Sequence, residues 1–483
     1  MERLRALPRW LYILVAILVT GIFYFFSTGL DGFRPLVWIA PIPILVLAFR
    51  LPVRWALVVA FGAYLIGGFN LFAYLAELTT PIVAIISAVI PAIAFALAVL
   101  VTRYTVLQFQ HWSTVLVFPV MWTSYEYVLS IVSPHGTAGS LAYTQTDFLP
   151  LIQIASLTGI WGVTFILTLV PAGVALAWHL RGDRRQAVSV LIVPLLLSLL
   201  VLSYGWIRLA QPIVGLSVRV GLATTDTTIQ YFETEQREEA LPVVQAYARR
   251  IGELADQGAE VVVLPEKFVG VTQDYLEEVV RILGKAAGDN QVTVVAGLNL
   301  IDPEHNRNIA LVFSPDGQLL AEYQKAYLIP GFESDYQPGT KPTIFSILDT
   351  PTGVAICKDM DFPGWMTQYA RLGARILFIP SWDFGIDGRL HSRMAVVRGI
   401  EGGFAVVRSA QEGLVTVSNH LGQILAEAKS STEADVLLVS QVQLGPGHTL
   451  YSLIGDWFAW LTVLVLALIL AMITLRTLRI RRE

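Results

Sequence analysis

Six long apolar runs limit this chain to folds that place much of it in a lipid bilayer. Each run holds about 20 mostly apolar residues, the length of a helix that crosses the hydrocarbon core. The runs cover 10–27, 55–75, 80–102, 160–179, 188–207 and 457–475. Only 14% of the 483 residues are charged, whereas soluble proteins carry roughly 25%. We therefore expect an α-helical membrane bundle.

Two weaker segments raise the expected number of spans to eight. The segment 35–49 is short and contains three prolines, and the segment 112–132 contains Glu126. Arginine placement supports both segments, because cytoplasmic loops accumulate Lys and Arg. With eight spans, all the arginine clusters that flank spans fall on one side of the membrane. These clusters comprise Arg3, Arg5, Arg9, Arg50, Arg54, Arg103, Arg181, Arg184, Arg185, Arg476, Arg479, Arg481 and Arg482.

This topology places both chain ends in the cytoplasm and the polar part of the chain outside. The first span could instead be a cleaved signal peptide, but its apolar core is long and no A-x-A-like site follows it. The chain then has three zones. We expect a bundle of seven helices over 1–210, a soluble domain over 215–445, and a C-terminal transmembrane helix with a basic tail over 455–483.

The soluble zone alternates between strand-like and helix-like patterns. "SVRVGLATT" and "AEVVVLPEKF" are typical of strands, and "REEALPVVQAYARRIGELADQG" has apolar residues at helical spacing. "NIALVFSPDGQLLAEYQK" predicts a hairpin that turns at Ser-Pro-Asp-Gly. This alternation predicts an α/β domain in which both faces of the sheets are covered.

The chain has a single cysteine, Cys357, at the end of the apolar run "GVAI". One thiol cannot form an internal disulfide, and one thiolate makes a poor metal site. The sequence contains no His-rich or Cys/His cluster, and we expect neither a metal nor a cofactor. The net charge of −4 gives no sign of nucleic-acid binding. Cys357 is then either an inert buried residue or a nucleophile.

Two more reactive side chains follow predicted strands. Glu266 follows "VVVLP" and Lys325 lies in "YQKAY". Taken singly, each fits a solvated loop residue. With Cys357 they could form one chemical unit, because a thiol needs a base to become a nucleophile and Glu266 can supply it. Lys325 and a backbone N–H near Cys357 can stabilise a tetrahedral oxyanion.

The order of "LPEKF", "YQKAYLIPGFE" and "AICKDMDFP" resembles the nitrilase superfamily of carbon-nitrogen hydrolases. This resemblance implies a nitrilase-like four-layer αββα sandwich and a Glu266-Lys325-Cys357 triad. "RMAVVRGIEGGFAVVRSAQEG" is similar to the Arg-x-x-Glu helix of that superfamily, which falls here on Arg398 and Glu401, and to the strand after it.

Seven spans before such a domain and one after it resemble the bacterial apolipoprotein N-acyltransferase family. "LAYTQTDFLPLIQIASLTGIWGVTF" is similar to a family segment that carries Tyr-x-Gln, which falls here on Tyr143 and Gln145. "FPVMWTSYEYVLS" places Glu126 on an intramembrane glutamate of the family, although Glu126 could also snorkel near the outer interface. Glu333 matches a functional glutamate of the family, although it could be a plain loop carboxylate.

The resemblance implies that an acyl chain moves from a phospholipid through a cysteine thioester to the N-terminal amine of a diacylated lipoprotein. It also implies a multi-pass protein of the bacterial inner membrane with its catalytic domain on the extracytoplasmic side. We expect a monomer with no nucleic-acid partner.

Three departures from the family concern the substrate more than the triad. The family usually has Cys-Tyr-Glu, whereas this chain has Cys357, Lys358 and Asp359. Lys358 could lower the pKa of the thiol or could face water. "HGTAGS" replaces an expected Phe-Pro-Trp element, and "PSWDFG" stands where the family has S-N-D-x-W-F-G.

A membrane-bound carbon-nitrogen hydrolase remains open as an alternative function. An intact triad argues against a non-catalytic scaffold. The spans hold few charges and show no inverted repeat, which argues against a transporter.

Overall fold

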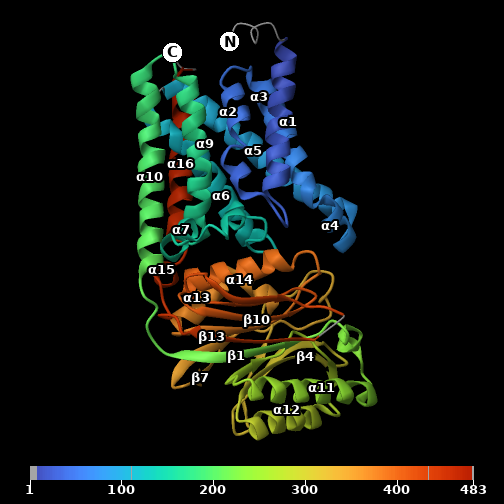
Figure 1. Cartoon of the computed structure of the whole chain (residues 1–483). Helices are drawn as coiled ribbons and strands as arrows, with labels where there is room; N and C mark the ends of the chain where they lie inside the picture. Colours follow the sequence, from blue (N-terminus) through green and yellow to red (C-terminus); the bar gives the residue numbers. More distant parts are fainter. Residues whose placement is uncertain (1–7, 110, 433–434, 481–483) are drawn as a thin grey trace. The chain divides into compact units, whose positions relative to one another are not determined.

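The computed structural model describes residues 8–109, 111–432 and 435–480 (Figure 1). The chain divides into two compact units, as far as their ranges are described. The first comprises Met1–Ser133, Thr137–Ile207 and Asp456–Glu483, and the second comprises Pro134–Gly136 and Arg208–Gly455. The short segment Pro134–Gly136, which the sequence analysis put in the bundle, thus groups with the second unit.

The first unit is a helix bundle. Over the described residues, seven of its helical segments are long and apolar enough to cross a membrane. These segments correspond to seven of the eight expected spans. The elements are α1 (Arg9–Ser27), η2 (Arg34–Trp38), α2 (Ile42–Ala48), α3 (Val53–Gly68), η3 (Phe69–Leu71), α4 (Phe72–Leu78), α5 (Pro81–Phe109), η4 (Trp112–Leu116), α6 (Val117–Val132), η5 (Leu141–Gln145), α7 (Leu149–Ile152), α8 (Ala155–Thr158), α9 (Ile160–His179), α10 (Arg184–Ala210) and α16 (Trp457–Ile480).

The remaining expected span, 35–49, is a broken one. Its residues form the 3-10 helix η2 and the short helix α2, and Pro41 lies between the two pieces. A proline inside a helix removes a hydrogen-bond donor and clashes with the preceding turn, which explains the break. Figure 1 shows the two pieces returning the chain from the end of α1 to the beginning of α3. Within residues 8–109, 111–432 and 435–480 the bundle therefore has seven long apolar helices and one interrupted apolar segment.

Contacts within the first unit bring the arginine-bearing helix ends together. The guanidinium of Arg103 on α5 donates to backbone carbonyls of the connection between α2 and α3. The ring of Phe49, directly after α2, lies 4.8 Å from the ring of His179 at the end of α9. The Tyr104 hydroxyl lies 3.3 Å from Thr477 Oγ1 of α16. The ends of α2, α5, α9 and α16 therefore share one end of the bundle.

The second unit contains two sheets. The first has the strand order β13-β1-β2-β4-β5-β6, with β3 also paired to β4, and the second has the order β12-β11-β10-β9-β8-β7. The strands are β1 (Ser217–Thr224), β2 (Val261–Val263), β3 (Gly270–Thr272), β4 (Thr293–Ile301), β5 (Arg307–Phe313), β6 (Leu319–Gln324), β7 (Thr343–Ile347), β8 (Thr350–Val354), β9 (Ile376–Trp382), β10 (Ala405–Gln411), β11 (Leu414–Ser418), β12 (Ile424–Lys429) and β13 (Val436–Gln443).

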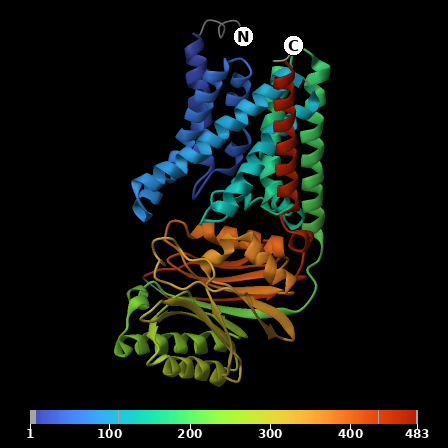
Figure 2. The same cartoon turned by 180° about the vertical axis from the view of Figure 1, so that it is seen from behind.

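Helices cover the outer face of each sheet. Figures 1 and 2 show α11 (Arg237–Asp256) and α12 (Leu276–Asn290) on the first sheet, and α13 (Pro363–Arg371) and α14 (Gly388–Gly402) on the second. The smaller elements are η6 (Ile229–Glu233), η7 (Cys357–Asp361) and α15 (Leu450–Ile454). In β2, Val261 and Val263 join the core between the sheets, whereas Val262 packs toward α11 and α12. This alternation follows from the period of two in a strand, and the four-layer αββα sandwich is confirmed.

Candidate active site

Glu266, Lys325 and Cys357 lie at or just beyond the ends of three different strands in the second unit. Glu266 comes three residues after β2, and Lys325 comes directly after β6. Cys357 begins η7, three residues after β8, so the strand before it ends earlier than the sequence pattern predicts. All three side chains are buried. The two sheets therefore supply the base candidate and the lysine from one side and the thiol from the other.

The backbone of Glu266 is held against the neighbouring strands. Its N–H donates to the Ser381 carbonyl oxygen at 3.3 Å, and Gln411 Nε2 donates to its carbonyl oxygen at 3.0 Å. A Cβ at Gly297 on β4 would lie only 2.8 Å from Glu266 Cα. A glycine at this position therefore permits the close approach of the glutamate backbone to β4.

The two carboxylate oxygens of Glu266 have different surroundings. Oε1 accepts hydrogen bonds from Asn308 Nδ2 at 2.7 Å and from Lys325 Nζ at 2.8 Å. Oε2 is buried and has no hydrogen-bond partner among the described residues. Buried polar atoms are normally paired, and an exception calls for an explanation. One oxygen thus fixes the carboxylate, while the other can accept a proton.

Lys325 is completely buried between two carboxylates. Its Nζ lies 2.8 Å from Glu266 Oε1 and 2.9 Å from Glu333 Oε2. Burial alone would lower the pKa of Lys325, but the charges of Glu266 and Glu333 raise this pKa well above the ordinary value. The side chain is therefore a permanent ammonium, which can stabilise negative charge on a reacting carbonyl.

Glu333 is an anchored carboxylate rather than a solvated loop residue. Besides Lys325, it accepts hydrogen bonds from Lys267 Nζ at 3.1 Å, Asn308 Nδ2 at 2.8 Å and the Ile329 N–H at 2.8 Å. Burial raises the pKa of Glu333, but the lysines outweigh this effect and lower it to about 2. Glu333 therefore stays ionised and holds the Lys325 ammonium in place.

Cys357 has an unusual backbone conformation. Its φ angle is +43°, in the left-handed region that non-glycine residues rarely occupy. Such strained positions cluster at functional sites. The thiol lies 3.3 Å from the Trp382 carbonyl oxygen, to which it donates. Burial raises the pKa of Cys357 well above its usual value, Glu266 raises it further, and Lys325 opposes both. The resting thiol is therefore neutral and needs a base to become a nucleophile.

Asp359 connects the backbone around Lys325 with the backbone around Cys357. One of its oxygens accepts from the N–H groups of the two residues after Lys325, at 3.1 and 2.9 Å. The other accepts from the Ile356 N–H at 2.9 Å and from the Tyr323 hydroxyl at 2.6 Å. Burial raises the pKa of Asp359 to about 6, although these hydrogen bonds favour its charged form. Asp359 therefore has contacts that can hold the backbone around Lys325 and the backbone around Cys357 at a fixed spacing.

Lys358 is buried, which excludes the expected alternative that it faces water. Its Nζ lies 3.2 Å from His135 Nδ1 and 3.4 Å from Asp361 Oδ2. Asp361 is shared with His391, whose other ring nitrogen lies 3.2 Å from Asp387. Burial alone would lower the pKa of His391, but the two aspartates raise it to about 10. Lys358 therefore fixes the segment Pro134–Gly136 to the turn that carries the nucleophile candidate.

Arg398 and Glu401 lie on α14 and form a buried ion pair, with Nη1 and Oε2 3.0 Å apart. The pair joins neighbouring turns of one helix. The Thr449 hydroxyl also donates to the Glu401 carbonyl oxygen. The pair therefore stays within α14, and the Thr449 contact ties the backbone of this helix to the residue before α15.

Glu126 lies in the first unit and is buried rather than snorkelling. Its carboxylate accepts hydrogen bonds from Trp122 Nε1 at 2.9 Å, Ser140 Oγ at 2.6 Å, the Leu141 N–H at 2.9 Å and Thr164 Oγ1 at 2.8 Å. These donors come from α6, α9 and the start of η5. Glu126 therefore ties η5 to two membrane helices.

Tyr143 and Gln145 also lie on η5. The Tyr143 hydroxyl lies 2.7 Å from Thr137 Oγ1. Gln145 accepts from Trp38 Nε1 at 3.1 Å and donates to the Arg34 carbonyl oxygen at 3.2 Å. Together with Glu126, these residues give the segment 137–145 a fixed conformation inside the bundle.

Several site residues were not recognised in the sequence. Asn308 bridges Glu266 and Glu333, and Lys267 contacts Glu333. Arg408 on β10 forms a buried pair with Asp383. The available signal was a polar residue inside an otherwise apolar strand, as in "RNIALVF" and "FAVVRSAQ". Lys267 offered no such signal beyond its place next to Glu266.

Comparisons with known proteins match both units. A model of the carbon-nitrogen hydrolase family matches residues 222–446, and a model of the apolipoprotein N-acyltransferase N-terminal domain matches residues 20–173. An apolipoprotein N-acyltransferase of Geobacter metallireducens is 27% identical, over 97% of this chain and 96% of its own length. An apolipoprotein N-acyltransferase of Treponema denticola is 25% identical, over 72% of this chain and 75% of its own length.

Two amidases are also similar to part of this chain. An (R)-stereoselective amidase of a Pseudomonas species is 26% identical, over 41% of this chain and 73% of its own length. The crystal structure of an amidase from a Nesterenkonia species is 21% identical, with a TM-score of 0.41, over 48% of this chain and 94% of that structure.

Proposed function

The chain belongs to the apolipoprotein N-acyltransferase family, and we propose that it moves an acyl chain from a phospholipid to the N-terminal amine of a diacylated lipoprotein. The observation that carries this proposal is the single buried thiol of Cys357, held at a strained turn with Glu266 and Lys325 acting on its charge. The chain also has membrane helices, which an enzyme for small soluble substrates would not need.

The first half of the reaction forms a thioester. Glu266 takes the proton of the Cys357 thiol, and the sulfur attacks the ester carbonyl of the phospholipid. The negative oxygen of the tetrahedral intermediate is stabilised by the Lys325 ammonium and a backbone N–H next to Cys357. The carbon–oxygen bond of the ester then breaks, and Glu266 returns its proton to the departing lysophospholipid alcohol. The acyl chain is left on sulfur.

The second half transfers the acyl chain to nitrogen. The lipoprotein amine attacks the thioester carbonyl, and Glu266 accepts a proton from the amine. The carbon–sulfur bond breaks, the proton passes to the sulfur, and the products are an amide and the free thiol. One residue thus acts first as base and then as acid in each half-reaction.

The surrounding residues keep this machinery in its working geometry. Asn308 and Lys325 both contact Oε1 of Glu266, which supports Oε2 as the proton acceptor. Glu333 and Lys267 form a second ion pair that orients Lys325. Asp359 sets the spacing between the lysine and the nucleophile turn.

We propose that the enzyme is a monomer in the bacterial inner membrane, with its second unit on the extracytoplasmic side. The support is the single end of the bundle at which α2, α5, α9 and α16 present their arginines, because such ends are usually cytoplasmic. The end of α10 and the beginning of α16 lead into the second unit from the opposite end.

The decisive experiment is the intact mass of membrane-purified protein. A fatty acyl adduct should be present, hydroxylamine should remove it, and Cys357→Ala should never carry it. A diacylated peptide with an N-terminal cysteine should then receive the acyl group as an amide. The similarity of the chain to an (R)-stereoselective amidase favours hydrolysis as the alternative. If only free fatty acid appears in the presence of the peptide, the transferase proposal fails and the hydrolase remains.

A further inference from the structure

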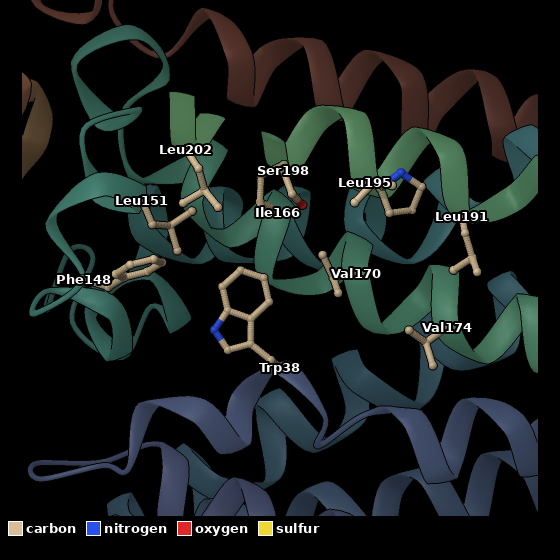
Figure 3. Close-up of a pocket in the computed structure, with 11 residues that line it drawn as sticks. Trp38, Phe148, Leu151, Ile166, Val170, Val174, Leu191, Leu195, Ser198 and Leu202 are labelled. Carbon is tan, nitrogen blue, oxygen red and sulfur yellow. The ribbon is translucent and has the colours of Figure 1, made fainter. Parts of the chain in front are cut away.

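A groove of about 450 Å³ opens between η2, α9 and α10 in the first unit (Figure 3). Its walls are hydrocarbon and aromatic side chains with one hydroxyl. The lining residues are Trp38, Phe148, Leu151, Ile166, Val170, Val174, Leu191, Pro194, Leu195, Ser198 and Leu202. No residue of the proposed catalytic site lies in this groove.

The groove is long and narrow. On α9 its lining residues run from Ile166 to Val174, and on α10 from Leu191 to Leu202. With a rise of 1.5 Å per residue, these stretches are about 12 and 16 Å long. One leaflet of the hydrocarbon core is about 15 Å thick. The dimensions therefore suit one extended acyl chain better than a compact ring-shaped ligand.

Contacts between α9 and α10 close the floor of the groove. A Cβ at Gly173 would lie 2.7 Å from Pro194 Cγ, so the two helices touch there. Ser198 has the smallest side chain among the lining residues. Its Oγ has no hydrogen-bond partner among the described residues. The contact between the two helices is thus made by the Gly173 backbone and the Pro194 ring.

The aromatic end of the groove carries a positive charge. The guanidinium carbon of Arg34 lies 5.7 Å from the centre of the Phe148 ring, and Trp38 lies one turn of η2 further along. Arg34 is exposed. A Cβ at Gly205 would clash with the backbone of Pro150, so this end lies near the end of α10, away from Arg184. Arg34 therefore stands apart from the arginines at the other end of the bundle.

We propose that this groove binds one acyl chain of a bilayer phospholipid, with the phosphate of its headgroup at Arg34. The hydrocarbon walls match the chain, and a guanidinium is well suited to bind phosphate by charge-assisted hydrogen bonds. The interfacial aromatics Trp38 and Phe148 lie between these two parts, as such residues do at membrane interfaces. The site does not depend on which reaction occurs at Cys357.

A photocrosslinking experiment tests the chain-binding part. Full-length Cys357→Ala protein in nanodiscs is irradiated with a phosphatidylethanolamine that carries a diazirine on its acyl chain, so no acyl transfer can interfere. Peptides of α9 and α10 should be labelled more than those of α16, which is also exposed. Ser198→Trp should lower the labelling at least about fivefold, because the ring fills the groove. Val170→Phe fills it from the opposite wall and should act in the same way.

Leu199→Trp is the matched control, because Leu199 is the next residue of α10, is 52% exposed and does not line the groove. It should leave labelling unchanged. The headgroup part is tested by Arg34→Gln, which should weaken labelling by the phospholipid but not by an uncharged diacylglycerol with the same diazirine. Equal labelling of the Cys357→Ala protein with and without Ser198→Trp or Val170→Phe would rule out this groove as the site of chain binding. Equal phospholipid labelling of the Cys357→Ala protein with and without Arg34→Gln would rule out the phosphate contact.

Discussion

Asn308 Nδ2 donates to Glu266 Oε1 at 2.7 Å and to Glu333 Oε1 at 2.8 Å, so one amide joins the two carboxylates that flank Lys325. Asn308→Asp would replace this donor by a third carboxylate in a buried site, where unpaired charge is costly. We expect the rate of thioester formation to fall by about 10-fold or more, the scale of a lost charged contact. Gln273→Glu, which adds a carboxylate on the exposed surface, should leave the rate unchanged. A rate within twofold of wild type for Asn308→Asp would show that the bridge is dispensable.

Glu266→Gln should slow thioester formation at least about 10²-fold, the scale of general-base catalysis. The amide keeps the size of the side chain and can still accept from Asn308, but it cannot take the thiol proton. The measurement is single-turnover acylation followed by intact mass. Glu277→Gln on the exposed surface of α12 is the matched control. Near-normal acylation by Glu266→Gln would assign another base.

The thiol of Cys357 should titrate above its ordinary pKa, because burial and Glu266 both disfavour the thiolate. The chain has no other cysteine, so the thiolate absorbance or alkylation rate reports on this residue alone. In the folded protein, thiolate should appear only at higher pH than in the unfolded chain. Because the folded state retains the proton longer, this group makes the protein less stable as pH rises above the ordinary thiol pKa. Titration of the folded thiol at or below that value would contradict the site geometry.

His391 should make stability depend on alkaline pH. Its pKa is about 10 in the folded protein against 6.5 for an ordinary histidine, because Asp361 and Asp387 hold the charged form. The charged histidine stabilises the folded protein fully below pH 6.5, and this stabilisation is lost as the pH rises toward 10. We therefore expect the Tm to fall over this range, and to fall less in His391→Gln. His305→Gln, at an exposed position, should behave like wild type. Parallel curves for wild type and His391→Gln would rule out this role.

A reporter fused after Ala210 should be active only if it works outside the cytoplasm. The reason is that the end of α10 lies opposite the helix ends that carry the arginine clusters. A second fusion in the 180–183 connection between α9 and α10 should show the reverse activity. An active cytoplasmic reporter after Ala210 would invert the proposed topology.

The sequence predicted the long elements of both units because their signals are local and repeated. Six apolar runs of bilayer length and the weaker segment 112–132 predicted seven long helices, and strand and helix periodicity predicted the sandwich. Pro41 was visible in the sequence, but the sequence did not show that the span 35–49 would be interrupted there. The segment "HGTAGS" looked like a loop of the bundle, whereas His135 within it contacts Lys358 of the second unit.

The site was only partly accessible from sequence. Glu266, Lys325 and Cys357 stood out because each carries reactive chemistry near a strand end. Asn308 and Lys267 did not, since their roles arise only when β5 and the loop after β2 approach Glu333 in space. The hydrogen-bond partners of Glu126 likewise come from three separate segments, so residue spacing within any one segment does not predict them.

The carboxylates of Glu266 and Glu333 and the ammonium groups of Lys325 and Lys267 form a buried set whose charges sum to zero. In the proposed first step a proton moves from the thiol to Glu266, and the sum for the set plus the thiol stays at zero. No net charge therefore has to enter or leave the protein interior while the nucleophile is formed. An electroneutral step of this kind avoids the large cost of creating an isolated charge in a low-dielectric interior. Its rate should respond little to the ionic strength of the medium, which screens exposed charges far more than buried ones.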